Sequence, residues 1–332
     1  MIGAGSFGRH HLRILSKSPN AQLAGVVDSN ADRAAAAGAE YACPVYATPA
    51  KLAGKIDAAV VAVPTSHHAE VGCTLLENGI DVLVEKPIAH DLASARRLVE
   101  TAARHGRILQ VGHLERFNPA VAALKKIVRL PLFFEIHRLS LFSPRSLDVD
   151  VVLDLMIHDL DIVLSLTGQP VREVRAVGLP VLSKKVDIAN ARLEFENGCV
   201  ANFTASRVST ERVRKMRFFQ PHQYLSLDFA RQDLLLIDVS AAAGMDMKEL
   251  AALAAMQAKL VHPTGGHPSP GMAIRKVSVE AGEPLRLEIE SFLDAVRTRT
   301  QPEVTVEDGR AALKLALEIN SAIGSHARRT GL

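Results

Sequence analysis

Short apolar runs alternate with helix-like segments in the first third of the chain. Residues 58–63 form an almost uninterrupted apolar run, typical of a strand that is covered on both faces. Each such run is followed by a segment long enough for a helix to cross back over the sheet. This alternation predicts a doubly wound parallel sheet, the Rossmann type of α/β fold. The expected strands are 22–27, 58–63, 82–85 and 108–112, and the expected helices are 11–18, 64–78 and 92–105.

The pattern changes after residue 130, where strand-like runs follow one another with few helices between them. Glu196-Asn197-Gly198 separates two of these runs and is typical of a hairpin turn. We therefore expect a Rossmann domain over residues 1–117 and an α+β domain over residues 118–332, with a mostly antiparallel open sheet and a last helix that packs back on the first domain. The expected strands of the α+β domain are 132–141, 172–181, 188–195, 199–206, 215–219 and 224–229. Its expected helical segments are 245–260, 285–298 and 306–327, and residues 262–271 are expected to form a loop.

Length and composition narrow the class of protein. A chain of 332 residues exceeds what one hydrophobic core usually serves, which favours two domains. Hydrophobic residues make up 48% and charged residues 23%, as in an ordinary soluble globular protein. The formal net charge is +3 and the charges are interspersed, so nothing favours a nucleic-acid partner. We expect no membrane span, because no stretch of about 18 apolar residues occurs, and no signal peptide.

The cysteines bear on the compartment. Cys43, Cys73 and Cys199 are an odd number, lie far apart and lack the spacing of metal ligands. Free thiols in a reducing cytoplasm are the simplest interpretation, and we expect a cytoplasmic protein.

A glycine-rich turn opens the chain. Gly3, Gly5 and Gly8 complete a G-x-G-x-x-G pattern, whose turn and following helix bring main-chain N–H groups to a pyrophosphate. Asp28 lies 20 residues after Gly8, where a carboxylate accepts hydrogen bonds from the adenosine ribose. A carboxylate repels a 2′-phosphate, so NAD is favoured over NADP, although Arg33 softens that preference. The alternative for Asp28 is a helix cap. The predicted cofactor-binding residues here are Gly3, Gly5, Ser6, Phe7, Gly8 and Asp28.

The strand before this turn is unusually short. Only Met1 and Ile2 precede Gly3, whereas the first strand of such a fold normally has five or six residues. We expect the central strand to be truncated, or several residues to be missing before Met1. Either would weaken the fold and the dinucleotide site.

A lysine ends one of the predicted strands. The apolar run 82–84 stops at Glu85, Lys86 and Pro87, and proline cannot continue the strand. Ligands of open α/β sheets bind outside the carboxyl ends of the strands, so Lys86 is expected at a ligand site. The alternative is a solvated lysine in a turn.

A polar stripe crosses an otherwise apolar helix in the second half. Within residues 151–164, Asp154, His158 and Asp161 recur at helical spacing. Buried charge is costly unless it is paired or used, so these residues either satisfy one another or line a pocket. An imidazole with a neighbouring carboxylate suits proton transfer. Further ligands at convincing spacing are lacking, so no metal site is predicted.

Together these residues resemble the Gfo/Idh/MocA family, named for glucose–fructose oxidoreductase and inositol dehydrogenase, over nearly the whole chain. The resemblance implies NAD(P)-dependent oxidation of a secondary hydroxyl, with Lys86 beside the nicotinamide and the reacting hydroxyl. It also implies that His158, aided by Asp154, carries the proton, and that the chain forms a homodimer or homotetramer. The residues that carry it are the glycine turn, Asp28, Pro64 to His68, Glu85-Lys86-Pro87, Arg116-Phe117-Asn118-Pro119, Asp154-x-x-x-His158, Glu290-Ser291-Phe292 and 306–309.

The family pattern implies further site residues. Pro64, Thr65, His68, Glu85, Lys86 and Arg116 are expected to contact the cofactor, although the family often has Asn where Thr65 stands. The segment before the Asp-His motif is commonly glycine-rich in the family, which residues 146–152 are not.

Stretches 111–120, 143–162 and 217–229 are similar to a branch that oxidises UDP-N-acetylglucosamine at position 3 in lipid A biosynthesis. This makes a nucleotide sugar the expected substrate. A free polyol or monosaccharide such as inositol is the alternative, and a non-catalytic NAD(H)-binding sensor is the third. A diphosphate needs cations, for which Arg116, Arg138 and Arg145 are candidates. Substrate-binding roles are also expected for Lys86, Asp154 and His158, and a coupled aminotransferase would consume the ketone product.

Overall fold

The computed structural model describes residues 1–142, 149–258 and 272–331. Their contacts divide into two compact units. The first contains residues 1–117 together with 160–162 and 282–318, and the second contains the described parts of 118–159, 163–281 and 319–332. The expected boundary at 117 thus omits two segments of the first unit. One of them carries Leu285 and Ile289, whose side chains are buried against Ile14.

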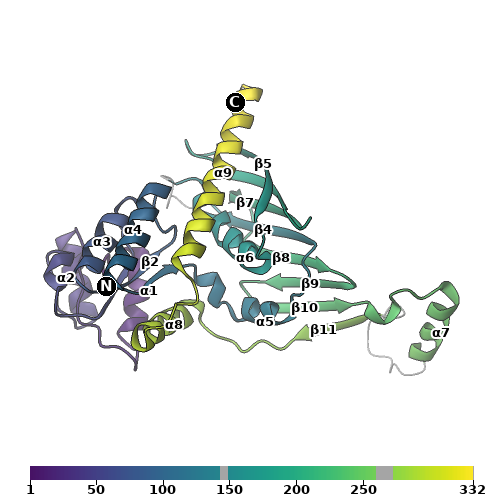
Figure 1. Cartoon of the computed structure of the whole chain (residues 1–332), viewed down its shortest axis with the longest axis horizontal. Helices are drawn as coiled ribbons and strands as arrows, with labels where there is room; N and C mark the ends of the chain where they lie inside the picture. The colour runs from purple at the N-terminus through teal and green to yellow at the C-terminus, as the bar shows by residue number, and fades with distance from the viewer. Residues whose placement is uncertain (143–148, 259–271, 332) are drawn as a thin grey trace. The chain divides into compact units, whose positions relative to one another are not determined.

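The first unit is built on parallel strands. β1 (Ala58–Val61), β2 (Asp81–Glu85) and β3 (Leu109–Gly112) pair in parallel in the order β1-β2-β3, as predicted (Figure 1). Every residue of β2 is buried, both the apolar run 82–84 and the acidic residues Asp81 and Glu85 at its two ends. The helices of this unit are α1 (Ser6–Leu15), α2 (Ala31–Glu40), η1 (Pro49–Leu52), η2 (Thr65–His67), α3 (His68–Glu77), α4 (Leu92–His105), η3 (Leu114–Phe117), α8 (Pro284–Thr298) and the first part of α9 (Val306–Thr330).

The central strand position is held by Ile2. Its N–H donates to the carbonyl oxygen of Val60 at 2.8 Å, and it forms parallel bridges to Val27 and Val61. The predicted strand 22–27 is reduced to bridges at Val26 and Val27. The prediction was too long because a ladder extends only where a neighbouring strand runs alongside, and Ile2 reaches no farther along this segment.

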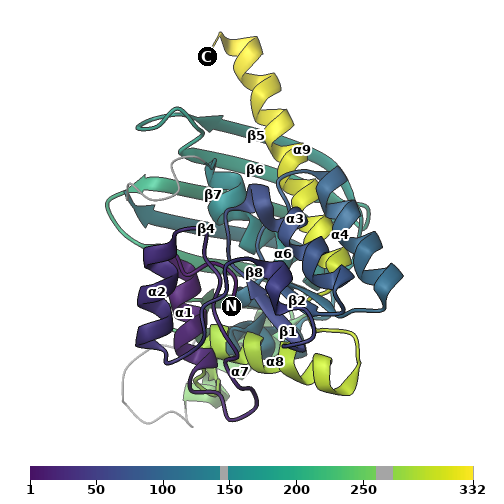
Figure 2. The same cartoon turned by 90° about the vertical axis from the view of Figure 1, so that its left-hand side faces the viewer.

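Helices cover both faces of the parallel strands. Figure 2 shows α1 and α2 on one side of β1 and β2, with α3 and α4 on the other. Their starts follow from local chemistry, because the side chains of Asn30 and Asp91 accept hydrogen bonds from main-chain N–H groups in the first turns of α2 and α4. α1 begins five residues earlier than predicted, because Gly5 takes the cap position directly after the glycine turn. Asp28 is not the cap of α2.

The second unit contains a large sheet. Its described strands follow the order β11-β10-β9-β8-β4-β7-β6-β5, and only β4 and β7 pair in parallel (Figure 1). The Glu196-Asn197-Gly198 hairpin joins β6 to β7 as predicted, with Gly198 at a φ of 81°. The strands are β4 (Phe133–Leu141), β5 (Val171–Leu179), β6 (Ile188–Phe195), β7 (Val200–Ser209), β8 (Val213–Gln220), β9 (Gln223–Asp228), β10 (Asp233–Asp238) and β11 (Ala273–Val277).

One face of this sheet is buried and the other is open. Along β8, buried residues such as Met216 and Phe218 alternate with exposed or half-buried ones. The sequence reading missed β10 and β11. The remaining elements of this unit are α5 (Pro119–Ile127), η4 (Val152–Met156), α6 (Ile157–Thr167), η5 (Ser240–Ala242) and α7 (Met247–Ala258). The expected loop 262–271 lies outside the described residues.

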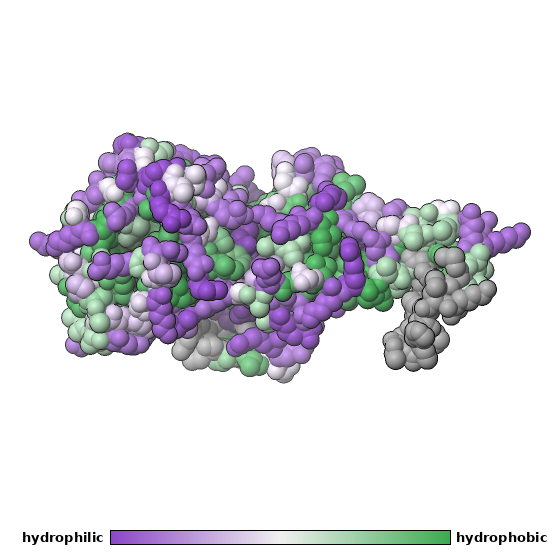
Figure 3. All heavy atoms as spheres, turned by 90° about the horizontal axis from the view of Figure 1, so that it is seen from below, coloured by the Kyte–Doolittle hydropathy of each residue, from purple (hydrophilic) through white to green (hydrophobic). Residues whose placement is uncertain are grey.

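The surface carries hydrophilic and hydrophobic residues side by side. Figure 3 shows hydrophilic and hydrophobic side chains mixed over the face seen from below. In the part of the chain that the structure describes, no helix is both long and apolar enough to cross a membrane. The thiols of Cys43, Cys73 and Cys199 are free and buried.

Candidate functional site

The glycine turn has the shape of a phosphate cradle. A Cβ on Gly3 would lie 2.5 Å from the carbonyl oxygen of Ala62, and one on Gly8 would lie 2.0 Å from that of Gly3. These two glycines are therefore required by the fold. A Cβ on Gly5, in contrast, would meet only the Arg33 guanidinium, at 3.6 Å. The space beside Gly5 at the start of α1 is left open by the protein, and the uncapped helix N-terminus suits an anion there.

Asp28 is tied to this turn. Its Oδ2 accepts a hydrogen bond of 2.7 Å from the N–H of Ala4, and its Oδ1 accepts one of 2.8 Å from Asn30. Arg33 lies 3.6 Å from Oδ1. A carboxylate has lone pairs left after these contacts, so Asp28 keeps the capacity to accept from a ribose hydroxyl. The turn, the helix N-terminus and this carboxylate fit a dinucleotide.

The turn after β1 is fastened by His68. Its Nδ1 lies 2.9 Å from the carbonyl oxygen of Pro87 and its Nε2 lies 2.9 Å from that of Val63. The ring is buried, and burial lowers the pKa of His68. It links the ends of β1 and β2, while Pro64 is exposed and Thr65 half-buried on the outer side of the turn. Contacts of these three residues with a cofactor stay a prediction.

Lys86 lies where the sequence placed it, directly after the carboxyl end of β2. It is half-buried, and the Lys86–Pro87 peptide bond is cis. His113 follows β3 and is buried; burial lowers its pKa, and the charges of Lys86 and Glu85 both act on it. These three residues thus come together at one edge of the parallel sheet, where ligands of such folds bind.

The Asp-His motif is interrupted by a π-helical turn. Asp154 lies in η4 and His158 in the first turn of α6, and both side chains are half-buried. Such turns occur often at functional sites, because the extra residue redirects side chains. Asp161, the third residue of the predicted stripe, forms an ion pair with Arg116 within the first unit. Proton transfer by Asp154 and His158 stays a prediction.

Two of the candidate arginines form buried ion pairs. Arg116 donates to Asp161 at 2.7 and 3.0 Å, and Asp308 lies 3.3 Å away. Arg138 donates to Asp159 at 2.8 and 2.7 Å. Both arginines are less than a tenth exposed. A substrate diphosphate would have to compete with these carboxylates, so the structure gives both residues a structural task. Arg145 lies outside the described residues.

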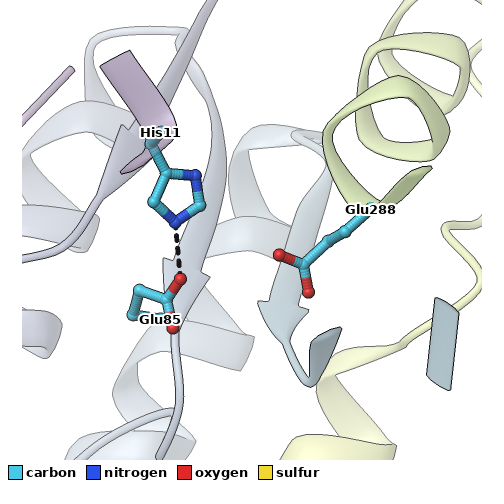
Figure 4. Close-up of side chains that lie close together, drawn as sticks. All are labelled: His11, Glu85 and Glu288. Carbon is cyan, nitrogen blue, oxygen red and sulfur yellow. Dashed lines mark hydrogen bonds and ion pairs between the residues drawn. The ribbon is translucent and has the colours of Figure 1, made fainter. Parts of the chain in front are cut away.

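The sequence reading missed a buried cluster of His11, Glu85 and Glu288. Their side chains come from α1, β2 and α8 (Figure 4). A signal was present, because Glu288 occupies a position among Leu285, Ile289 and Phe292 that should be apolar.

In comparisons with known proteins, two family models match separate parts of the chain. Residues 1–113 match a family described as an oxidoreductase family with an NAD-binding Rossmann fold, and residues 139–220 match the GFO/IDH/MocA C-terminal domain. UDP-N-acetylglucosamine 3-dehydrogenase from Acidithiobacillus ferrooxidans is 34% identical over 330 residues, which is 99% of this chain and 98% of that one. Its structure is similar with a TM-score of 0.85, over 98% of this chain and 96% of that chain.

Other matches cover less of the chain or have lower sequence identity. Inositol 2-dehydrogenase 4 from Saccharopolyspora erythraea is 34% identical over 186 residues, covering 52% of this chain and 55% of that one. A putative myo-inositol dehydrogenase from Sinorhizobium meliloti shares the fold, with 21% identity over 98% of this chain and 96% of that one, and a TM-score of 0.76. The full-length match, the two family domains and the glycine turn agree with the predicted resemblance: the chain belongs to the Gfo/Idh/MocA family of oxidoreductases.

Proposed function

We propose that the protein is an NAD-dependent dehydrogenase that oxidises the 3-hydroxyl of UDP-N-acetylglucosamine. The observation that supports this substrate is the 34% identity to UDP-N-acetylglucosamine 3-dehydrogenase from Acidithiobacillus ferrooxidans over 98% of that enzyme's length. Within this family substrates change readily on one scaffold, so the match favours this sugar without excluding others. Asp28 beside the glycine turn supports NAD over NADP, since a 2′-phosphate would meet its carboxylate.

Separate residues would bind the cofactor and carry out the proton transfer. The open space at Gly5 and the start of α1 would hold the pyrophosphate, and Asp28 the adenosine ribose. A bound nicotinamide supplies the hydride acceptor. His158 takes the hydroxyl proton and Asp154 orients its imidazole, while the Lys86 ammonium stabilises the charge that develops on the oxygen. The reversed assignment, with Lys86 as the base, stays open.

The open sheet face of the second unit supports a homo-oligomer. The ring of Phe219 on β8 lies 5.6 Å from that of Phe133 on β4 and 5.0 Å from that of Tyr224 on β9, between ring centroids, and Phe219 is 37% exposed. Exposed aromatic clusters are common at interfaces between subunits. We propose that the chain assembles as a dimer or tetramer through this face, and that an aminotransferase consumes the ketone product.

A polyol dehydrogenase is the second candidate, because several inositol dehydrogenases match about half of the chain. The experiment is nicotinamide absorbance with purified protein, NAD and a panel of UDP-N-acetylglucosamine, UDP-glucose, free N-acetylglucosamine, glucose and myo-inositol, with a carbonyl trap. NADH formation with UDP-N-acetylglucosamine alone is the expected result. Turnover of a free sugar or inositol would overturn the nucleotide-sugar assignment. If no substrate of the panel gave NADH while NAD binding stayed intact, another sugar substrate or a role as an NAD(H)-binding sensor would be favoured.

A further inference from the structure

Glu85 connects a buried cluster to the lysine of the proposed active site. Its Oε1 lies 2.6 Å from Nε2 of His11, and its Oε2 accepts a hydrogen bond of 3.2 Å from the main-chain N–H of Lys86. A Cβ on Gly112 would lie 3.1 Å from Oε2, so the glycine on β3 lets the carboxylate sit against the neighbouring strand. Both oxygens of Glu85 are thus committed to fixing the end of β2.

Glu288 brings a second carboxyl group to the same place. It reaches from α8 toward Glu85 and His11, and one ligand atom from each of the three residues lies within 4.8 Å of the others (Figure 4). Glu288 is 0% exposed, and among the described residues neither of its carboxyl oxygens has a hydrogen-bond partner. Burial and the neighbouring Glu85 raise the pKa of Glu288 well above its ordinary value.

Among the described residues, the charged groups near this cluster are engaged by other partners. Arg116 on η3 is engaged by Asp161 and Asp308, and burial lowers the pKa of His113. Gln110 on β3 is uncharged, and its Nε2 donates to the main-chain oxygen of Glu288. One imidazole, that of His11, therefore faces two carboxyl groups, and two buried carboxylates side by side cannot both be ionised at modest cost.

We propose that Glu288 holds a buried proton, which leaves Glu85 as the single anion of the cluster. Glu85, anchored by His11, then acts as a positioning residue that fixes the main chain of Lys86. The Lys86 part rests on the proposed function, whereas the proton on Glu288 does not.

A metal ion is the competing occupant. Two ligands of a tetrahedral zinc ion with bonds of about 2.1 Å lie about 3.4 Å apart. The 2.6 Å between His11 and Glu85 is instead a hydrogen-bond distance. The geometry therefore favours a proton.

The first experiment measures stability against pH by urea unfolding of Glu288→Gln and, as a matched control on the same helix, the half-exposed Glu290→Gln. The pKa of Glu288 is raised on folding. Its contribution to the stability of the folded protein is therefore fully present below the unfolded pKa of about 4.3, and it is lost as pH rises. Folding of the wild type then takes up a proton, and its equilibrium constant falls by up to about tenfold per pH unit above that value.

Glu288→Gln should remove this proton uptake and become increasingly more stable than the wild type as pH rises, while Glu290→Gln keeps the wild-type pH dependence. Glu288→Gln with wild-type pH dependence would overturn the proposal. So would stabilisation of the wild type, but not of Glu288→Gln, by zinc or manganese ions. Neither measurement requires a substrate, so they stand even if the dehydrogenase assignment fails.

The second experiment addresses Lys86. Glu85→Gln has one acceptor oxygen for two donors, the His11 imidazole and the Lys86 N–H, so it should lower kcat at least about tenfold. Glu288→Gln should extend turnover to higher pH than the wild type. With 13C-labelled lysine, the Lys86 NMR resonance, identified by its loss in Lys86→Arg, should shift in Glu85→Gln and not in Glu290→Gln. An unmoved resonance in Glu85→Gln would overturn the positioning role whether or not a substrate is found.

Discussion

The N–H of Ala4 donates a hydrogen bond of 2.7 Å to Oδ2 of Asp28, so the proposed ribose-binding carboxylate is also part of the phosphate-binding turn. Asp28→Asn should therefore affect both subsites, because an amide group cannot accept from Ala4, from Asn30 and from a ribose as a carboxylate does. We expect NAD affinity to fall by about 1–3 kcal/mol, roughly 5- to 150-fold. Titration calorimetry measures this. Unchanged affinity would show that the cofactor does not reach Asp28.

Arg33 tests the choice of cofactor. Its side chain lies 3.6 Å from the Asp28 carboxylate, where a 2′-phosphate would approach. Arg33→Ala should weaken NADP binding by at least about fivefold and leave NAD binding nearly unchanged, because it removes a cation close to the phosphate. The ratio of the two dissociation constants is the measurement. Equal losses for both cofactors would contradict this role.

The glycines separate the demands of the fold from those of the ligand. Gly5→Ala should fold with nearly wild-type stability yet bind NAD at least about tenfold more weakly, because its Cβ meets only Arg33 inside the protein. Gly8→Ala should instead be destabilised by several kcal/mol, since its Cβ overlaps the Gly3 carbonyl. Thermal unfolding and NAD titration of both variants make the comparison. Normal NAD binding by Gly5→Ala would contradict the cradle.

Lys86→Ala and His158→Ala should each reduce kcat at least about 100-fold, because both remove a group that acts in the transition state. NAD affinity should stay within about twofold in His158→Ala, whose side chain is not assigned to the cofactor. Steady-state kinetics and fluorescence titration with NADH provide these values. Near-normal turnover in both variants would refute the assigned roles.

Arg138 tests whether a buried ion pair or substrate binding explains the residue. Arg138→Lys cannot reproduce the two hydrogen bonds to Asp159, so we expect a loss of about 2–4 kcal/mol in the free energy of unfolding. The KM for substrate should change less than threefold. Urea unfolding and kinetics test both points, and wild-type stability with a large rise in KM would restore Arg138 to substrate binding.

The sequence by itself determined the parts of the protein that rest on local spacing. Strand–helix alternation predicted the parallel sheet, the hairpin at Gly198 predicted the β6–β7 pair, and three glycines at fixed intervals predicted the phosphate turn. These features depend on neighbours within a few residues, so period and turn chemistry are sufficient to find them.

Tertiary structure decided which charged groups meet. From the sequence, Arg116 and Arg138 were candidates for binding a diphosphate. In the structure they form ion pairs with Asp161 and Asp159, which lie more than 20 positions away along the chain. Glu288 lies 203 residues from Glu85 in sequence, and only the packing of α8 brings the two carboxyl groups together. Burial and pairing depend on these long-range contacts, which the order of residues along the chain does not reveal.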